Sequence, residues 1–170
     1  MKVIKVKIEP LSPEAFEPFG QVISSFNEIR PEVRVGGLQE REYTVTAETS
    51  EPPPEKPSLS EGLARAHFAF HTDAGQSFYP SRHCPTVFFV GPVKEVLGPD
   101  DIRAFFSDGS LGICMHPEIW HTMPICLEGT EVYQTARGDQ DYQTYSVEVD
   151  FDAERGLTLE PDVESSVRTD

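Results

Sequence analysis

The stretch ARAHFAFHTDAGQSFYP, residues 64–80, decides the fold prediction for this chain. Alternate residues of a β-strand point to opposite sides, so the two faces can be separated by counting in twos. One face is polar and basic and carries Arg65, His67, Ala69 and His71. The other is apolar and carries Ala66, Phe68 and Phe70. Residues 72–75, TDAG, are typical of a turn, and residues 76–79 predict a second strand, so chemistry is expected on the polar face of a strand pair.

The rest of the chain is also rich in strand patterns. Short runs that alternate or are apolar throughout occur at residues 3–8, 22–23, 43–46, 86–90, 112–115, 120–125, 132–135 and 142–151. Two short peripheral helices are expected: one capped by Ser12, with Pro13 in its first turn, and one running from Pro99 through Phe106. Many short strands with Gly and Pro turns favour a mainly β sandwich or barrel.

Length and composition indicate one domain. The chain has 170 residues, 38% of them hydrophobic, which suits a single core. We assign that domain to residues 1–161, with an exposed proline-rich loop at 46–58 and a polar C-terminal tail at 162–170.

Charge and cysteine usage exclude several classes of function. The net charge of −15 disfavours nucleic acid and anionic membrane surfaces as partners. The sequence has neither an 18-residue apolar run nor a signal-peptide pattern at its start, so a cytoplasmic location is expected. Three cysteines without CxxC spacing predict neither a disulfide framework nor a zinc ribbon. A small carboxylate substrate would need a local positive group in such an acidic protein.

Histidines gather in the middle of the sequence, at positions 67, 71, 83, 116 and 121. The segment from His71 to Gln76 has the spacing of the first cupin motif, although Ala69 stands where the first ligand would be and Gln76 where a glutamate is usual. An amide oxygen can coordinate a hard cation but supplies no charge. Two interpretations stay open: metal ligation by this pair, or a turn cap with a glutamine bonded to backbone.

A second histidine segment, GICMHPEIWH at residues 112–121, is similar to the second cupin motif. His121 occupies the last ligand position, so His71, Gln76 and His121 form the candidate set for one divalent metal ion of unknown identity. His116 would face away from His121 in a continuous strand, unless the bend at Pro117 brings it to the pocket rim. Trp120 is either core or dimer packing, the commoner role for an indole, or a substrate contact.

Four segments together resemble the ureidoglycolate lyase family of the cupin superfamily. They are PLSPEAFEPFGQVI (residues 10–23), HTDAGQSFYP (71–80), IRAFFSDGSLGICMHPEIWHTMPI (102–125) and the late acidic strand that ends in EVD (148–150). The resemblance implies a cupin-like double-stranded β-helix, or jelly-roll barrel, usually a homodimer, that splits ureidoglycolate into glyoxylate and urea during purine breakdown. The chain departs from the family at Ala69 and Phe70, where an acidic and basic pair is usual, and at His83, which replaces a turn glycine.

These patterns assign provisional roles to pocket residues. The expected catalytic residues are His71, His121 and His116, because imidazoles suit proton transfer near neutral pH. The expected substrate contacts are Arg65, Gln76, His67 and Trp120. Arg65 is the candidate carboxylate clamp, with a surface arginine as the rival interpretation. No organic cofactor is expected, and the apolar Phe68 and Phe70 face is expected at the dimer interface.

Two other functions remain open at this point. A mononuclear iron cupin oxygenase is one, although the two-histidine, one-carboxylate face typical of such enzymes lacks its carboxylate. A non-catalytic cupin that binds a small metabolite is the other. Stoichiometric iron would favour the first, and absence of both metal and urea release would favour the second.

Overall fold

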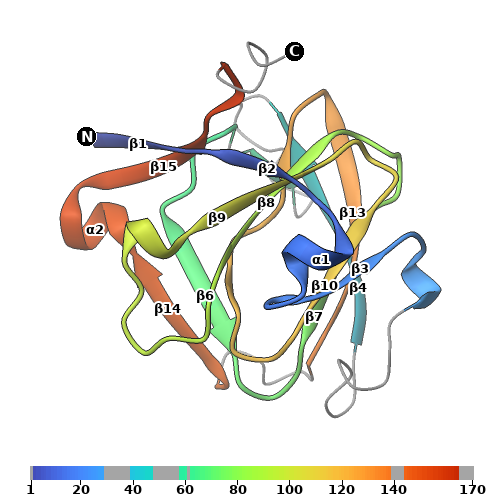
Figure 1. The fold of residues 1–170 in the computed structure, drawn as a ribbon, viewed down its shortest axis with the longest axis horizontal. Helices are drawn as coiled ribbons and strands as arrows, with labels where there is room; N and C mark the ends of the chain where they lie inside the picture. Colours follow the sequence, from blue (N-terminus) through green and yellow to red (C-terminus); the bar gives the residue numbers. More distant parts are fainter. Residues whose placement is uncertain (1, 29–38, 48–57, 61, 139–143, 165–170) are drawn as a thin grey trace.

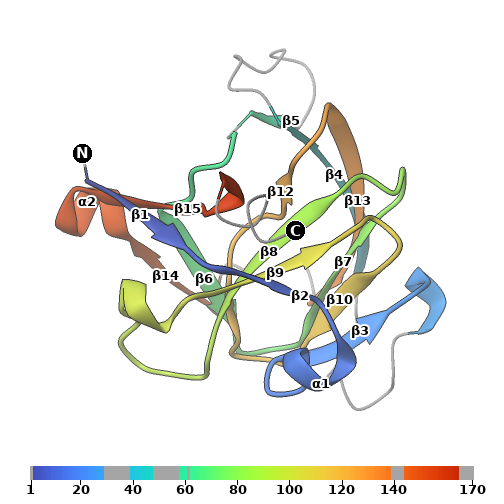
Figure 2. The same ribbon diagram turned by 45° about the horizontal axis from the view of Figure 1, so that its top comes forward.

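The computed structural model describes residues 2–28, 39–47, 58–60, 62–138 and 144–164, and this part of the chain is mainly β (Figures 1 and 2). It contains two short α-helices, α1 (Pro13–Phe16) and α2 (Phe151–Arg155), and two 3-10 turns, η1 (Phe26–Glu28) and η2 (Pro99–Asp101). None of the helices in these ranges has the length and apolar character needed to cross a membrane.

The strands form two larger sheets and one strand pair. The first sheet has the order β3 (Gly20–Ile23), β10 (Gly112–Met115), β7 (Gln76–Pro80), β13 (Thr130–Arg137), β4 (Gln39–Thr46) and β5 (Ser58–Ser60). The second has the order β14 (Ser146–Asp150), β6 (His67–His71), β11 (Trp120–His121), β8 (Thr86–Gly91), β9 (Arg103–Ser107) and β2 (Ile8–Pro10), with β12 (Ile125–Cys126) also paired to β8. Near the termini, β1 (Lys2–Val6) runs parallel to β15 (Leu157–Pro161).

The space between the two larger sheets holds the first apolar core. Phe78 and Tyr133 enter it from the first sheet, and Phe88 and Phe105 enter it from the second. The pairings within the described ranges give separate open sheets, so the mainly β prediction is confirmed, while hydrogen bonding alone does not establish barrel closure.

A second core covers the outer face of the second sheet. Phe68 of β6 packs against Phe89 of β8, with ring centroids 6.2 Å apart, and against Phe151 of α2. Phe68 is completely buried there, and Phe70 lies edge-on to Trp120 at 4.6 Å between centroids. Phe68, one of the two phenylalanines expected at a dimer interface, therefore packs inside this chain, whereas Phe70 is half-buried. The dimer stays a prediction.

The predicted helix from Pro99 to Phe106 is wrong beyond its first turn. After η2, residues Arg103–Ser107 form strand β9, which pairs antiparallel with β8. Phe105 points into the first core and Ala104 into the second, which is the two-residue alternation of a strand. A short apolar run suits either structure, and here pairing with a neighbouring strand decides.

The N-terminal helix matches its prediction, because the Ser12 hydroxyl accepts a hydrogen bond from the amide of Ala15. The C-terminal helix α2 was missed. Asp150 caps it by accepting from the amides of Asp152 and Ala153, and Gly156 ends it in the left-handed conformation at φ 63°. The strand predicted over 142–151 therefore ends at Asp150, and its first residues lie outside the described ranges.

Two sequence predictions fall largely on residues that are not described. Residues 48–57 of the proline-rich loop and residues 165–170 of the polar tail lie outside the described ranges. The loop is flanked by the end of β4 and the start of β5, which pair in parallel.

Glu131 at the start of β13 generates a test of this architecture. Its completely buried carboxylate accepts from the backbone amides of Arg82, Cys84 and Val132 at 2.7–2.8 Å. We expect Glu131→Ala to lower the free energy of unfolding by roughly 2 to 4 kcal/mol, because it leaves these donors without their acceptor. Glu128→Ala, at an exposed position nearby, is the matched control in urea unfolding, and equal losses for the two variants would contradict this role.

Candidate functional site

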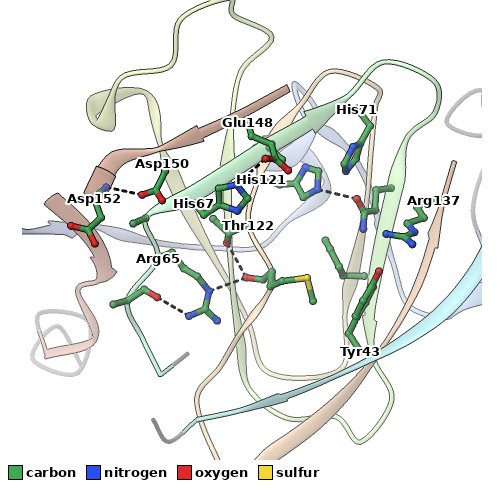
Figure 3. A pocket seen from close by; sticks show the side chains of 16 residues that line it. Tyr43, Arg65, His67, His71, His121, Thr122, Arg137, Glu148, Asp150 and Asp152 are labelled. Atoms are coloured by element: carbon green, nitrogen blue, oxygen red, sulfur yellow. Dashed lines mark hydrogen bonds and ion pairs between the residues drawn. The ribbon is translucent and has the colours of Figure 1, made fainter. Parts of the chain in front are cut away.

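A pocket of about 490 Å³ opens between the two larger sheets (Figure 3). The first sheet contributes Tyr43, Gln76, Phe78 and Arg137 to its lining. The second sheet contributes His67, Ala69, His71, His121, Glu148 and Asp150. The polar face predicted for β6 thus lines the pocket, while its apolar face lies in the core behind.

His71, Gln76 and His121 meet at one end of this pocket. Nε2 of His121 lies 2.9 Å from the side-chain oxygen of Gln76, and the centroids of the two imidazole rings are 5.2 Å apart. The three residues come from β6, β7 and β11, so the contact joins the two sheets. The convergence expected from two separate sequence segments is therefore present.

Backbone pairing explains how these side chains meet. His121 lies directly opposite Ala69 in the β11 and β6 pair, so it projects on the same face of the sheet as Ala69 and His71. Gln76 begins β7 immediately after the turn that leaves His71. The Gln76 amide and the Thr135 hydroxyl of β13 form a hydrogen bond at 3.3 Å, which anchors the far side of the amide.

Burial makes both imidazoles neutral at pH 7. It lowers the pKa of His121 to about 3, with a further contribution from the positive charge of a protonated His71. It also lowers the pKa of His71, although the negative charge of Asp73 and a hydrogen bond with Gln76 oppose that shift. Each ring therefore has a lone pair available at neutral pH, and the negative charge of Asp73 favours protonation of His71.

Arg137, which the sequence analysis did not select, provides positive charge in the pocket. It ends β13, its side chain is about nine-tenths buried, and its guanidinium lies 5.9 Å from the centre of the Tyr43 ring. Its charge reaches His71, whose pKa it helps to lower. Strand alternation places it on the same face as Thr135. Extending the predicted strand 132–135 by two residues would have found it.

Arg65, the predicted carboxylate clamp, is engaged by the backbone instead. It lines the pocket but is only 3% exposed. Its guanidinium donates to the carbonyl oxygens of Gly62, Ala64, Met123 and Pro124 at 2.8–3.3 Å. These four bonds connect the segment before β6 to the loop after β11. The guanidinium of Arg65 is therefore engaged in structural hydrogen bonds.

The opposite end of the pocket is acidic and open to solvent. His67 lies there with its Nε2 3.5 Å from a carboxylate oxygen of Glu148, and both side chains are more than half exposed. Asp150 and Asp152 complete this rim, which Figure 3 shows on the side away from Arg137. His67, a predicted substrate contact, therefore lies at the entrance of the pocket.

Trp120 and His116 lie outside the pocket lining. The indole of Trp120 is 2% exposed and donates to the carbonyl oxygen of Lys94 at 2.8 Å, so it packs in the outer core, the commoner role weighed above. His116 is half-buried, and its amide donates to the carbonyl oxygen of Phe19. The bend at Pro117 does not place His116 with His71 and His121.

The residues at the imidazole end are a poor fit for a divalent metal ion. In the part of the chain that the structure describes, no three His, Cys, Asp or Glu side chains gather as a metal-binding group. Gln76 would be the third donor and brings no negative charge, while the guanidinium of Arg137 would oppose a cation in the same space. The metal set expected from sequence remains a prediction for metal analysis to decide.

Comparison with known proteins identifies the same family in two ways. The profile of the ureidoglycolate lyase family matches residues 3–154 of this chain. The chain is 29% identical over 130 residues to the ureidoglycolate lyase of Pseudomonas aeruginosa strain LESB58, covering 72% of this chain and 77% of the relative. It is 31% identical over 131 residues to that of Azotobacter vinelandii strain DJ, covering 72% and 78%.

The buried imidazole of His121 predicts a loss of stability in acid. Its pKa falls from 6.5 to about 3 on folding, so between these values the unfolded chain binds a proton that the native chain does not. The stabilising contribution is present above pH 6.5 and is lost as the pH falls, by at most about 1.4 kcal/mol per pH unit. Urea unfolding should show that the free energy of unfolding falls between about pH 7 and about pH 5.5. This fall should be roughly 1 kcal/mol larger in the wild type than in His121→Gln. Equal drops would show that His121 is not the buried neutral group described above.

Proposed function

Because this chain belongs to the ureidoglycolate lyase family, we propose that it is a carbon–nitrogen lyase that splits ureidoglycolate into glyoxylate and urea, or acts on a closely related small hydroxy or carbonyl acid. The observation that carries the proposal is the convergence of two neutral imidazoles and one amide in a pocket that also contains Arg137.

Arg137 is the proposed carboxylate anchor. A guanidinium binds a carboxylate through two parallel hydrogen bonds, and this interaction becomes stronger when water is excluded. Arg137 lies beside the imidazole end, so a bound hydroxy acid would present its hydroxyl carbon to His71 and His121. The ureido group would then extend toward the open acidic rim, where carboxylates accept N–H groups.

His71 is the proposed proton carrier. Its Nε2 removes the hydroxyl proton of the substrate, the oxygen forms a carbonyl, and the carbon–nitrogen bond breaks with its electron pair going to nitrogen. The imidazolium then returns the same proton to that nitrogen, which completes urea. One imidazole suffices because the reaction neither consumes nor releases a proton overall.

His121 is better suited to holding the site than to accepting the proton. A pKa of about 3 makes its ring a weak base. Its contact with Gln76 orients the amide next to His71, which also forms a hydrogen bond with Gln76. The two residues then give the reacting hydroxyl a polar, water-poor environment.

The family also motivates proposals about architecture and setting. We propose that the two larger sheets together make the cupin-type barrel, and that the protein works as a homodimer in the cytoplasm. The proposal of a dimer rests on the family resemblance, because Phe68 is buried within the chain.

The first test is turnover of racemic ureidoglycolate by the purified protein, followed as glyoxylate and urea in equal amounts. We expect activity to persist after treatment with a chelator, because the residues at the site fit a divalent ion poorly. His71→Ala should reduce kcat by roughly 10² to 10⁴, while His116→Ala, outside the pocket lining, should retain activity. Absence of both products from folded wild-type protein would reject the proposed reaction, and activity that needs stoichiometric metal would reject the metal-free mechanism.

The second test concerns substrate binding. We expect Arg137→Gln to lower kcat/KM by roughly 10- to 100-fold, mainly through a higher KM, because a charge-assisted hydrogen bond to the carboxylate is lost. Arg82→Gln, on an exposed loop, is the matched control. Steady-state kinetics decide, and an unchanged KM in Arg137→Gln would assign the carboxylate to another group.

A further inference from the structure

Ser146 contacts His71, the proposed proton carrier. It lies directly opposite His71 in the β14 and β6 pair, and its hydroxyl oxygen is 2.6 Å from Nδ1 of His71. A hydroxyl can donate or accept. The direction of this bond therefore decides which nitrogen of His71 carries the proton and whether Nε2 is a base.

The tautomer of the neighbouring His121 follows from its own contacts. Nδ1 of His121 lies 2.9 Å from the carbonyl oxygen of Ile119, which can only accept, so Nδ1 carries the proton of the neutral ring. Nε2 of His121 is then a lone pair, and the group facing it must be a donor. Gln76 is this donor when its amide is flipped, with the oxygen and nitrogen positions exchanged. Its NH₂ group then faces the His121 ring, and Thr135 donates to its oxygen.

The contact with Ser146 involves one of the two ring nitrogens of His71. Nδ1 faces the Ser146 hydroxyl, so Nε2 is the nitrogen left to act as the base proposed above. A neutral imidazole has a lone pair on only one of its two nitrogens. A lone pair on Nε2 therefore places the proton on Nδ1, directed at Ser146.

We propose that Ser146 is a positioning residue that accepts the Nδ1 proton of His71 and so holds the ring in the tautomer whose Nε2 lone pair faces the pocket. Gln76 and the carbonyl of Ile119 impose the same tautomer on His121. The hydroxyl of a bound substrate then donates to the Nε2 lone pair of His71. Without Ser146 the ring can turn or change tautomer, and Nε2 ceases to be a base. The inference rests on the proposed function, in which Nε2 of His71 is the base.

The tautomers can be measured without any substrate. Two-bond ¹H–¹⁵N correlation spectra of ¹⁵N-histidine-labelled protein near pH 7 report which ring nitrogen is protonated. In the wild type we expect Nδ1–H at both His71 and His121. In Ser146→Ala we expect Nε2–H to become populated at His71, while Ser146→Thr, which keeps a hydroxyl, and Ser110→Ala, on an exposed turn, keep the wild-type pattern. Nε2–H at His71 of the wild type, or no change in Ser146→Ala, would overturn the proposal.

Kinetics give the second readout. With ureidoglycolate as substrate, Ser146→Ala should lose roughly 10- to 100-fold in kcat with little change in KM, and Ser146→Thr should recover most of it. Thermal melts of each variant separate this effect from unfolding. If wild-type protein does not turn over ureidoglycolate, the proposed function fails while the spectra still decide the role of Ser146. Full kcat in Ser146→Ala with a changed tautomer would show that the tautomer does not matter for catalysis and would refute the positioning role.

Discussion

The contact between His121 and Gln76 is the interaction on which the pocket depends. It is 2.9 Å long and joins a strand of one sheet to a strand of the other, at the edge of the apolar core that fills the space between them. Burying two polar groups at such a place is costly unless they satisfy each other. Their pairing lets the inner faces change from an apolar core to a polar pocket.

Burial at this junction also explains the character of the two histidines. Both rings lose the stabilisation that water gives to an imidazolium, so both are neutral, yet they differ in what surrounds them. His121 has a carbonyl and an amide as neighbours, whereas the negative charges of Asp73 and Glu148 act on His71 and oppose the lowering of its pKa by burial. This difference supports the proposed roles, in which His121 holds the site and His71 takes up a proton.

The structure describes the surroundings of two positions at which the sequence resemblance implies other residues. Ala69 lines the pocket directly opposite His121, where a longer acidic side chain would occupy space and bring charge. His83, where the resemblance implies a glycine, adopts φ 59°, a conformation that glycine accepts more easily. A hydrogen-bonding contact of 2.9 Å between its Nδ1 and the carbonyl oxygen of Gly109 helps to hold that turn.

The sequence by itself determined the mainly β class, most strand positions, the Ser12 cap and the polar face of residues 67–71, because these follow from alternation and local turn chemistry. It also indicated that His71, Gln76 and His121 belong together. Only the tertiary structure decided that residues 103–107 are a strand, that Arg65 donates to backbone carbonyls, that Arg137 lines the pocket and that Ser146 contacts His71. Those outcomes depend on which strands become neighbours, and partners far apart in sequence leave no local pattern from which that choice can be read.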